Sequence, residues 1–138
     1  MTPAILADAG PLVALFNPTD AFHGWALARF REFTQPLETA EPVLAECLHL
    51  LRRVPGGVGK LLVLWERGQL VISFSAELEK KAVSSLMKRY ADVPISLADA
   101  CLVRLTEIHS RSKVWTLDAD FGIYRRNGRQ TIPVITPA

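Results

Sequence analysis

The run Ala4-Ile5-Leu6-Ala7-Asp8 decides the fold, because a short apolar stretch ends abruptly in an acid. The same arrangement returns late in the chain, where Val114-Trp115-Thr116-Leu117 is followed by Asp118. Apolar runs of this length are typical of buried strands. In open α/β sheets, ligands bind outside the carboxyl ends of the strands. Asp8 and Asp118 are therefore predicted to face one site at that edge of a sheet.

Strand and helix patterns alternate along the chain between and around these two runs. Strands are expected over about 4–8, 37–40, 70–72, 113–117 and 131–135, and helices over about 10–16, 20–34, 42–53, 57–66, 75–90 and 96–109. This alternation predicts a mostly parallel central sheet covered on both faces, a three-layer α/β/α sandwich. A length of 138 residues fits one core, so residues 1–138 are expected to form a single domain.

The composition is that of a globular protein, with 49% hydrophobic and 22% charged residues. A net charge of +2 permits an anionic partner without requiring one. Cys47 and Cys101 lie in apolar helical patterns without a C-x-x-C motif, which suits core thiols in a reducing cytoplasm. The N-terminus has no signal-peptide pattern, and no apolar run approaches the roughly 20 residues of a membrane helix.

Two further acids lie in apolar surroundings. Glu46 and Asp99 fall early in helical patterns rich in Leu, Val, Ala and Cys. Burying an unpaired carboxylate is costly, and neighbouring carboxylates raise each other's pKa. A hard divalent cation relieves both penalties, so the sequence suggests a carboxylate-lined metal site. No His pair has the H-x-x-x-H spacing that would favour zinc.

Each of these acids also has a purely structural interpretation. Asp8 could be the N-cap of the helix that follows it, and Asp118 a turn or cap residue. Ser96-x-x-Asp99 has the spacing of a capping box. Glu46 could be a solvated glutamate on a helix surface. Taken singly, the structural interpretations of Asp8 and Asp118 compete with the metal site on about equal terms, and for Glu46 alone the structural interpretation is favoured.

Four segments, in order, resemble PIN-domain proteins. They are Leu6-Ala7-Asp8-Ala9-Gly10-Pro11-Leu12-Val13-Ala14-Leu15 followed by Asp20-x-x-His23-x-Trp25-Ala26, then Pro42-Val43-Leu44-Ala45-Glu46, Ser96-Leu97-Ala98-Asp99-Ala100, and Thr116-Leu117-Asp118-Ala119-Asp120-Phe121. The resemblance extends over essentially the whole chain. No single segment is specific, but four in the right order are strong together. The size suits the VapC-type toxins of toxin–antitoxin pairs.

The resemblance implies a Mg²⁺- or Mn²⁺-dependent endoribonuclease. Carried over residue by residue, the metal-binding and catalytic acids are Asp8, Glu46, Asp99 and Asp118. Asp120 would be an additional or outer ligand, and Thr116 a supporting hydroxyl. Cys47 departs from the family pattern, which often has a larger aliphatic residue after the glutamate. Carboxylate oxygens are the ligands that Mg²⁺ and Mn²⁺ prefer.

The expected partners follow from this function. RNA would be the substrate, with Lys113, Arg125 and Arg126 holding flanking phosphates. A cognate antitoxin and a homodimer are expected, and a membrane is not. A housekeeping RNA-processing nuclease and a catalytically silent RNA- or protein-binding module stay open as alternatives. The apolar stretch Leu61–Trp65 could serve a protein contact, although a core helix is the simpler interpretation.

Overall fold

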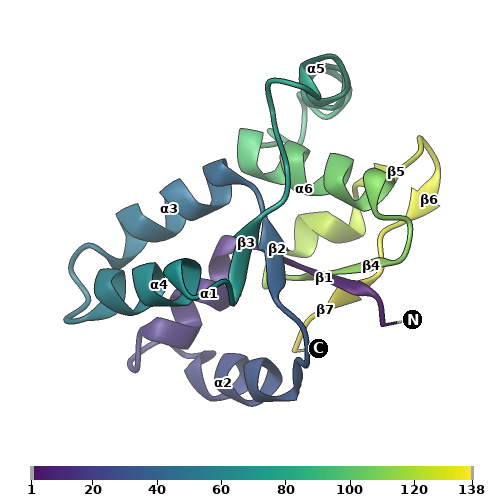
Figure 1. Cartoon of the computed structure of the whole chain (residues 1–138). Coiled ribbons are helices and arrows are strands. Elements are labelled where there is room, and N and C mark those ends of the chain that lie inside the picture. Colours follow the sequence, from purple (N-terminus) through teal and green to yellow (C-terminus); the bar gives the residue numbers. More distant parts are fainter. Residues whose placement is uncertain (1, 138) are drawn as a thin grey trace.

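The computed structural model describes residues 2–137, and within them a parallel sheet forms the middle layer (Figure 1). Its strands are β1 (Ala4–Ala7), β2 (Leu37–Thr39), β3 (Leu70–Ile72), β4 (Ser112–Trp115) and β7 (Val134–Ile135). Their order across the sheet is β3-β2-β1-β4-β7, and every pairing in it is parallel. The chain first adds strands on one side of β1 and then on the other. The topological switch point therefore lies between β1 and β4.

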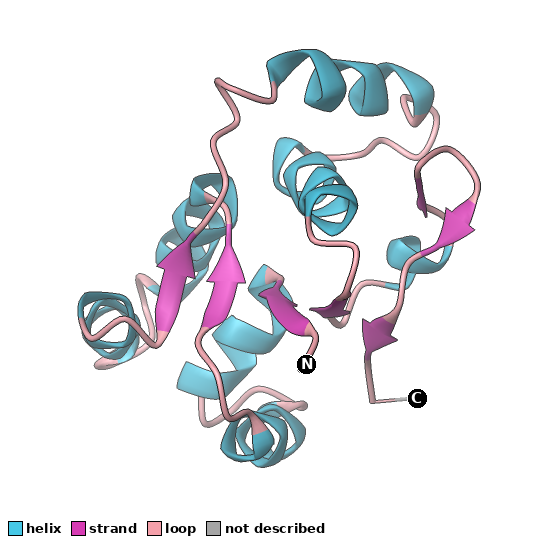
Figure 2. Cartoon of the chain, turned by 45° about the vertical axis from the view of Figure 1, so that its right-hand side comes forward, coloured by secondary structure: helices cyan, strands magenta, loops and turns pink. Residues whose placement is uncertain are grey.

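Helices cover both faces of this sheet (Figures 1 and 2). They are α1 (Ala9–Phe16), α2 (His23–Glu32), α3 (Glu41–Leu51), α4 (Gly57–Glu66), α5 (Lys80–Arg89) and α6 (Leu97–Ile108). The first four pack together on one side, α6 lies against the other face, and α5 packs on α6. The predicted three-layer α/β/α fold with a parallel sheet is confirmed.

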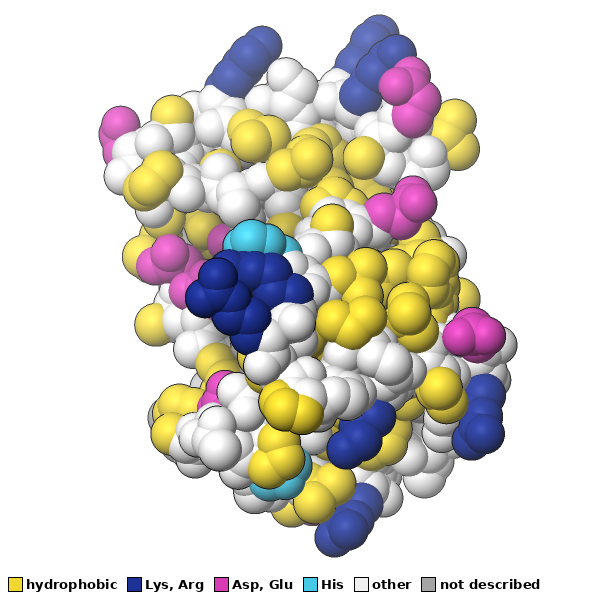
Figure 3. Space-filling view, turned by 90° about the vertical axis from the view of Figure 1, so that its left-hand side faces the viewer, with side chains coloured by type: hydrophobic (Ala, Val, Ile, Leu, Met, Phe, Trp, Pro, Cys, Tyr) yellow, Lys and Arg dark blue, Asp and Glu magenta, His cyan; other side chains and the backbone are white. Residues whose placement is uncertain are grey.

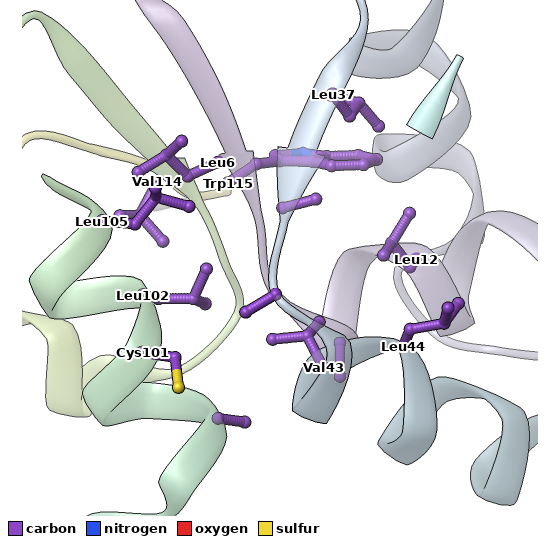
Figure 4. Packing of buried hydrophobic residues seen from close by; sticks show 14 of the residues in the cluster. Leu6, Leu12, Leu37, Val43, Leu44, Cys101, Leu102, Leu105, Val114 and Trp115 are labelled. Carbon is purple, nitrogen blue, oxygen red and sulfur yellow. The ribbon is translucent and has the colours of Figure 1, made fainter. Parts of the chain in front are cut away.

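The core has two halves, one on each side of the sheet (Figure 4). Leu6 and Val114 point toward Leu102 and Leu105 of α6, and all four are fully buried. On the other face, Trp115 packs its ring against aromatic residues of the α2 region, with centroid distances of 6.1 Å to Trp25 and 5.2 Å to Phe33. Burial of one such Leu contributes roughly 1.5–3 kcal/mol. Alternation of side chains along β1 and β4 thus anchors both strands between two apolar layers.

The helix expected over 75–90 is shorter than predicted. The Ser75 hydroxyl accepts a hydrogen bond from the Leu78 N–H at 3.2 Å, and α5 begins only at Lys80. Serine side chains compete with helical hydrogen bonding in this way. The helix expected from residue 20 likewise begins at His23, because the Asp20 carboxylate accepts from the Phe22 N–H and forms a turn.

The strand expected over 131–135 is two separate strands. Pro133 has no N–H to give to a ladder, and the chain changes partners around it. Before it, β6 (Gln130–Thr131) pairs antiparallel with β5 (Arg125–Arg126) in a hairpin. After it, β7 joins the main sheet beside β4. The turn of the hairpin contains Asn127 and Gly128, which adopt φ values of 53° and 82°.

The prediction for the two cysteines agrees with the structure. Cys47 and Cys101 are buried free thiols, as predicted. None of the helices between residues 2 and 137 combines the length and apolar character needed to cross a membrane.

Candidate metal centre

Asp8 lies directly after β1 and is almost completely buried, with 6% of its surface exposed. Its backbone N–H donates to the Trp115 carbonyl at 3.0 Å, which extends the β1–β4 contact by one residue. Oδ1 accepts from the Ala9 N–H at 2.8 Å, so Asp8 is the N-cap of α1. Oδ2 accepts from the Thr116 hydroxyl at 2.7 Å. Capping therefore uses one oxygen of Asp8, and the other faces β4.

Thr116 connects Asp8 to Asp118. Its hydroxyl donates to Asp8 and accepts from the Asp118 N–H at 2.9 Å. The Asp118 carboxylate in turn accepts from the Asp120 N–H at 2.9 Å and caps the 3₁₀ helix η1 (Ala119–Gly122). Gly10 permits the close approach of α1 to this segment, because a Cβ there would lie 3.2 Å from the Leu117 Cβ. Thr116 thus contacts both Asp8 and Asp118, and its supporting role stays a prediction.

Asp99 approaches the same place from the first turn of α6. The Ser96 hydroxyl accepts from the Asp99 N–H at 3.0 Å and caps the helix. The Asp99 carboxylate makes a different contact, because its Oδ2 accepts from the Tyr124 hydroxyl at 3.1 Å. Asp99 thus takes part in the cap through its backbone, and its carboxylate is available to the acid cluster. Sequence reasoning did not identify Tyr124, whose signal is a tyrosine four residues after Asp120.

Three of the predicted acids converge. One carboxylate oxygen from each of Asp8, Asp99 and Asp118 lies within 4.8 Å of the other two. We call these three residues the acid cluster. Glu46 of α3 and Asp120 line the same cavity of about 450 Å³, so they form its wall. The ion pairs found among residues 2–137 involve none of the acid-cluster carboxylates.

Burial perturbs the titration of two acids of the cluster. Loss of hydration raises the pKa of Asp8 from 3.8 to about 6, while hydrogen bonds from Thr116 and the Ala9 N–H oppose this rise. Burial also raises the pKa of Asp99 to about 6, and the charge of Asp8 adds to the effect. Both carboxyls are thus held in an environment that disfavours their charged forms. A cation beside them would reverse that preference.

The donor set fits a hard divalent cation. All side chains of the acid cluster offer oxygen, and so do the two further acids of the cavity wall. Oxygen-only sites suit Mg²⁺ and Mn²⁺, and zinc sites more often include His or Cys. The buried thiol of Cys47 contacts the Ala9 carbonyl at 3.9 Å, and burial raises its pKa above the usual range. A protonated thiol of this kind is a packing residue.

The predicted phosphate-binding residues lie outside the acid cluster. One guanidinium nitrogen of Arg125 donates to the carbonyls of Gly122, Ile123 and Tyr124 at 2.8–3.1 Å. Arg126 donates to the Ser110 carbonyl at 2.9 Å. Lys113 is exposed on β4. Contact between these residues and RNA stays a prediction.

The fold and the acid cluster together define a class of protein, a parallel α/β/α domain with carboxylates at its switch point. No family model and no curated protein matches the sequence. Among solved structures, the chain is similar to the crystal structure of VapC20 from Mycobacterium tuberculosis, described as a sarcin-ricin loop cleaving toxin. The TM-score is 0.76 with 22% sequence identity, over 87% of this chain and 94% of VapC20. This likeness confirms the predicted VapC-type fold.

Proposed function

We propose that this protein is a Mg²⁺- or Mn²⁺-dependent endoribonuclease that hydrolyses RNA phosphodiester bonds, and that it is the toxin of a toxin–antitoxin pair. The observation that carries the proposal is the acid cluster, with three carboxylate oxygens within 4.8 Å of one another at the switch point. The similarity to VapC20, which cleaves the sarcin-ricin loop, supports RNA as the substrate. The cytoplasm, where RNA and reduced thiols occur together, is the compartment that this function requires.

The residues have distinct tasks in this proposal. Asp8, Asp99 and Asp118 would hold the cation, with Glu46 and Asp120 as further ligands from the cavity wall. Thr116 orients Asp8 through the hydrogen bond of 2.7 Å and leaves that carboxylate few alternative rotamers. A divalent ion bound here supplies activation of water and stabilisation of the leaving oxygen. The cavity leaves room for a phosphodiester beside these acids.

An antitoxin and a second copy of the chain are the proposed protein partners. Figure 3 shows the molecule from the side of α3 and α4, where hydrophobic side chains gather beside a group of basic ones. The stretch Leu61–Trp65 belongs to α4, and its side chains divide between the core and the surface. Leu61 and Leu64 are buried, as a core helix requires, while Val63 and Trp65 are 43% and 41% exposed. This exposed pair is a reasonable first target for mapping either contact.

The direct test is RNA cleavage by the purified protein with Mg²⁺ or Mn²⁺ and with EDTA. Wild type should cleave only with metal, and Asp8→Asn should lower the rate at least about 100-fold, since even outer contacts of metal sites carry 10–100-fold effects. Asp20→Asn is the matched control, because this aspartate only forms a turn before α2. Cleavage that is equal in wild type and Asp8→Asn, or undiminished in EDTA, would contradict the proposal.

The toxin role is tested separately in cells. Overexpression of wild type should arrest growth and produce new RNA 5′ ends, and Asp8→Asn should do neither. A housekeeping nuclease would cleave RNA in vitro without arresting growth. A silent binding module would bind RNA or protein without cleavage under any metal condition.

A further inference from the structure

Tyr124 connects two parts of the chain that carry acids of the cluster. It is fully buried, and its hydroxyl donates to Oδ2 of Asp99 at 3.1 Å. A phenylalanine could fill the same space without a polar atom. A buried hydroxyl that lacks a hydrogen-bond partner destabilises the folded protein. The hydroxyl at this position is therefore explained by the carboxylate that it contacts.

The ring of Tyr124 is fixed on two sides. Phe121 and Tyr90 both pack against it edge to face, with centroid distances of 5.3 and 5.1 Å. The Tyr124 N–H donates to the Asp120 carbonyl at 3.1 Å. The Tyr90 hydroxyl accepts from the Arg125 N–H at 2.9 Å and so fixes the adjoining backbone. Because the ring and the backbone of Tyr124 are both held, the position of its hydroxyl oxygen is fixed.

Both ends of the segment 118–124 belong to or contact the acid cluster. At its start, Asp118 contributes a carboxylate and caps η1. At its end, Tyr124 reaches α6 and holds Asp99. One short, internally hydrogen-bonded segment therefore connects Asp118 to the carboxylate of Asp99. A carboxylate with one oxygen held by a fixed donor keeps its orientation when neighbouring negative charges repel it.

We propose that Tyr124 is a positioning residue, whose hydroxyl holds the Asp99 carboxylate in the orientation that binds a divalent cation together with Asp8 and Asp118. This inference rests on the proposed metal site and deepens it. Hydrogen-bond partners of metal ligands typically change metal affinity 10–100-fold. Tyr124 should have an effect in this range although it lies outside the cavity lining.

The test is Mn²⁺ affinity, measured by calorimetry near pH 8. At this pH the carboxyls of Asp8 and Asp99, whose pKa values are raised to about 6, have lost their protons. Tyr124→Phe keeps the ring and its packing, and it should bind Mn²⁺ at least roughly tenfold more weakly than wild type. Thr106→Val is the matched control, because it also removes a buried hydroxyl, which donates to the Val103 carbonyl within α6. That control should bind Mn²⁺ as wild type does. In an Asp99→Asn background, Tyr124→Phe should cause no further loss.

A second measurement needs no change at Tyr124. The chain has two tyrosines, so ring-labelled tyrosine gives two NMR signals that Tyr90→Phe assigns. Titration with Mg²⁺ should shift the Tyr124 signal and leave that of Tyr90 in place. Equal Mn²⁺ affinity of wild type and Tyr124→Phe, or an unmoved Tyr124 signal, would overturn the positioning role alone. Failure of wild type to bind either metal would overturn the metal site and this inference together.

Discussion

Two groups of charged side chains in this protein are built in opposite ways. Around Arg104, the charges are paired, with Nε 2.7 Å from Glu79 and Nη1 3.1 Å from Glu107. Glu107 also accepts from the Asn127 N–H at 2.6 Å, so this group ties α6 to the start of α5 and to the hairpin. In the acid cluster, three carboxylates of the same sign lie together. The acids of the first group have a basic partner within the protein. The ion pairs found among residues 2–137 include none of the acid-cluster carboxylates, so a cation from solution would be their counter-charge.

The comparison separates charges that stabilise the fold from like charges that oppose folding at the proposed metal site. Paired charges at a partly exposed site contribute little, commonly about 0–1 kcal/mol. Clustered like charges oppose folding until a ligand compensates them. Three predictions test this contrast, and each has its own reference measurement.

The largest difference should appear in the response to Mn²⁺. At a concentration about 100 times Kd, a ligand stabilises the folded state by about 2.7 kcal/mol, which raises the Tm of wild type by roughly 10 °C. Asp99→Asn should lose most of this rise. In EDTA near pH 7.5 the same variant should melt above wild type, because one of the repelling charges is gone.

Glu107→Gln is the reference for this experiment. It removes a carboxylate that has a basic partner, so it should melt below wild type in EDTA and keep the full Mn²⁺ response. If Asp99→Asn behaves like Glu107→Gln, the Asp99 carboxylate is structural and the acid cluster must be redrawn.

A smaller effect should appear in the pH dependence of stability without metal. The pKa values of Asp8 and Asp99 are raised from 3.8 to about 6 in the folded protein, so the folded state holds these protons more tightly than the unfolded state. The resulting stabilisation is complete below about pH 4 and is lost as pH rises through about 6. Thermal melts in EDTA should therefore show Tm falling by a few degrees between pH 5 and 7.

The variant Asp8→Asn and the metal provide the controls for the pH experiment. Asp8→Asn removes one carboxyl with a raised pKa, so it should flatten the fall in Tm over this interval. Mn²⁺ should oppose the fall, because it competes with protons for the same oxygens. A Tm in EDTA that does not depend on pH between 5 and 7 would show that the two carboxyls are not perturbed.

The smallest effect is expected from Arg125 and Arg126, whose guanidinium groups already donate to backbone carbonyls. If they also hold two RNA phosphates, replacing both with Ala should reduce the slope of log affinity against log salt by about 1.4 for single-stranded RNA. Binding should weaken similarly for different RNA sequences, because phosphate contacts carry no base information. Arg104→Ala is the reference and should leave the slope unchanged. An unchanged slope in the double variant would assign both arginines to the fold.

Sequence reasoning succeeded where the signal is local. Apolar runs that end in Asp8 and Asp118 gave the two strands that meet at the switch point, and helical periodicity gave α3 and α6 to within about two residues. It failed where a local choice depends on competing hydrogen bonds. The Ser75 turn shortened α5, and Pro133 divided the expected last strand.

The neighbourhood of each acid was harder to predict. Periodicity shows which residues face inward, but it does not show which strands become neighbours. The contact of Tyr124 with Asp99 joins residues 25 positions apart, and it depends on how the chain between η1 and β5 lies against α6. The backbone contacts of Arg125 likewise follow from the turn after η1, which no sequence pattern indicated.

The pairing of β1 with β4 also determines when the site can exist during protein synthesis. Ala4 is in register with Ser112 and Ala7 with Trp115, so the two strands that carry Asp8 and Asp118 come from distant parts of the chain. Parallel pairing over such a separation has a large loop-closure cost and forms late in folding. The chain must therefore emerge from the ribosome beyond residue 118 before the acids can assemble, and every nascent fragment that ends earlier lacks the site. A protein proposed to cut RNA is in this way inactive toward its own message and ribosome until both strands of the site have been synthesised.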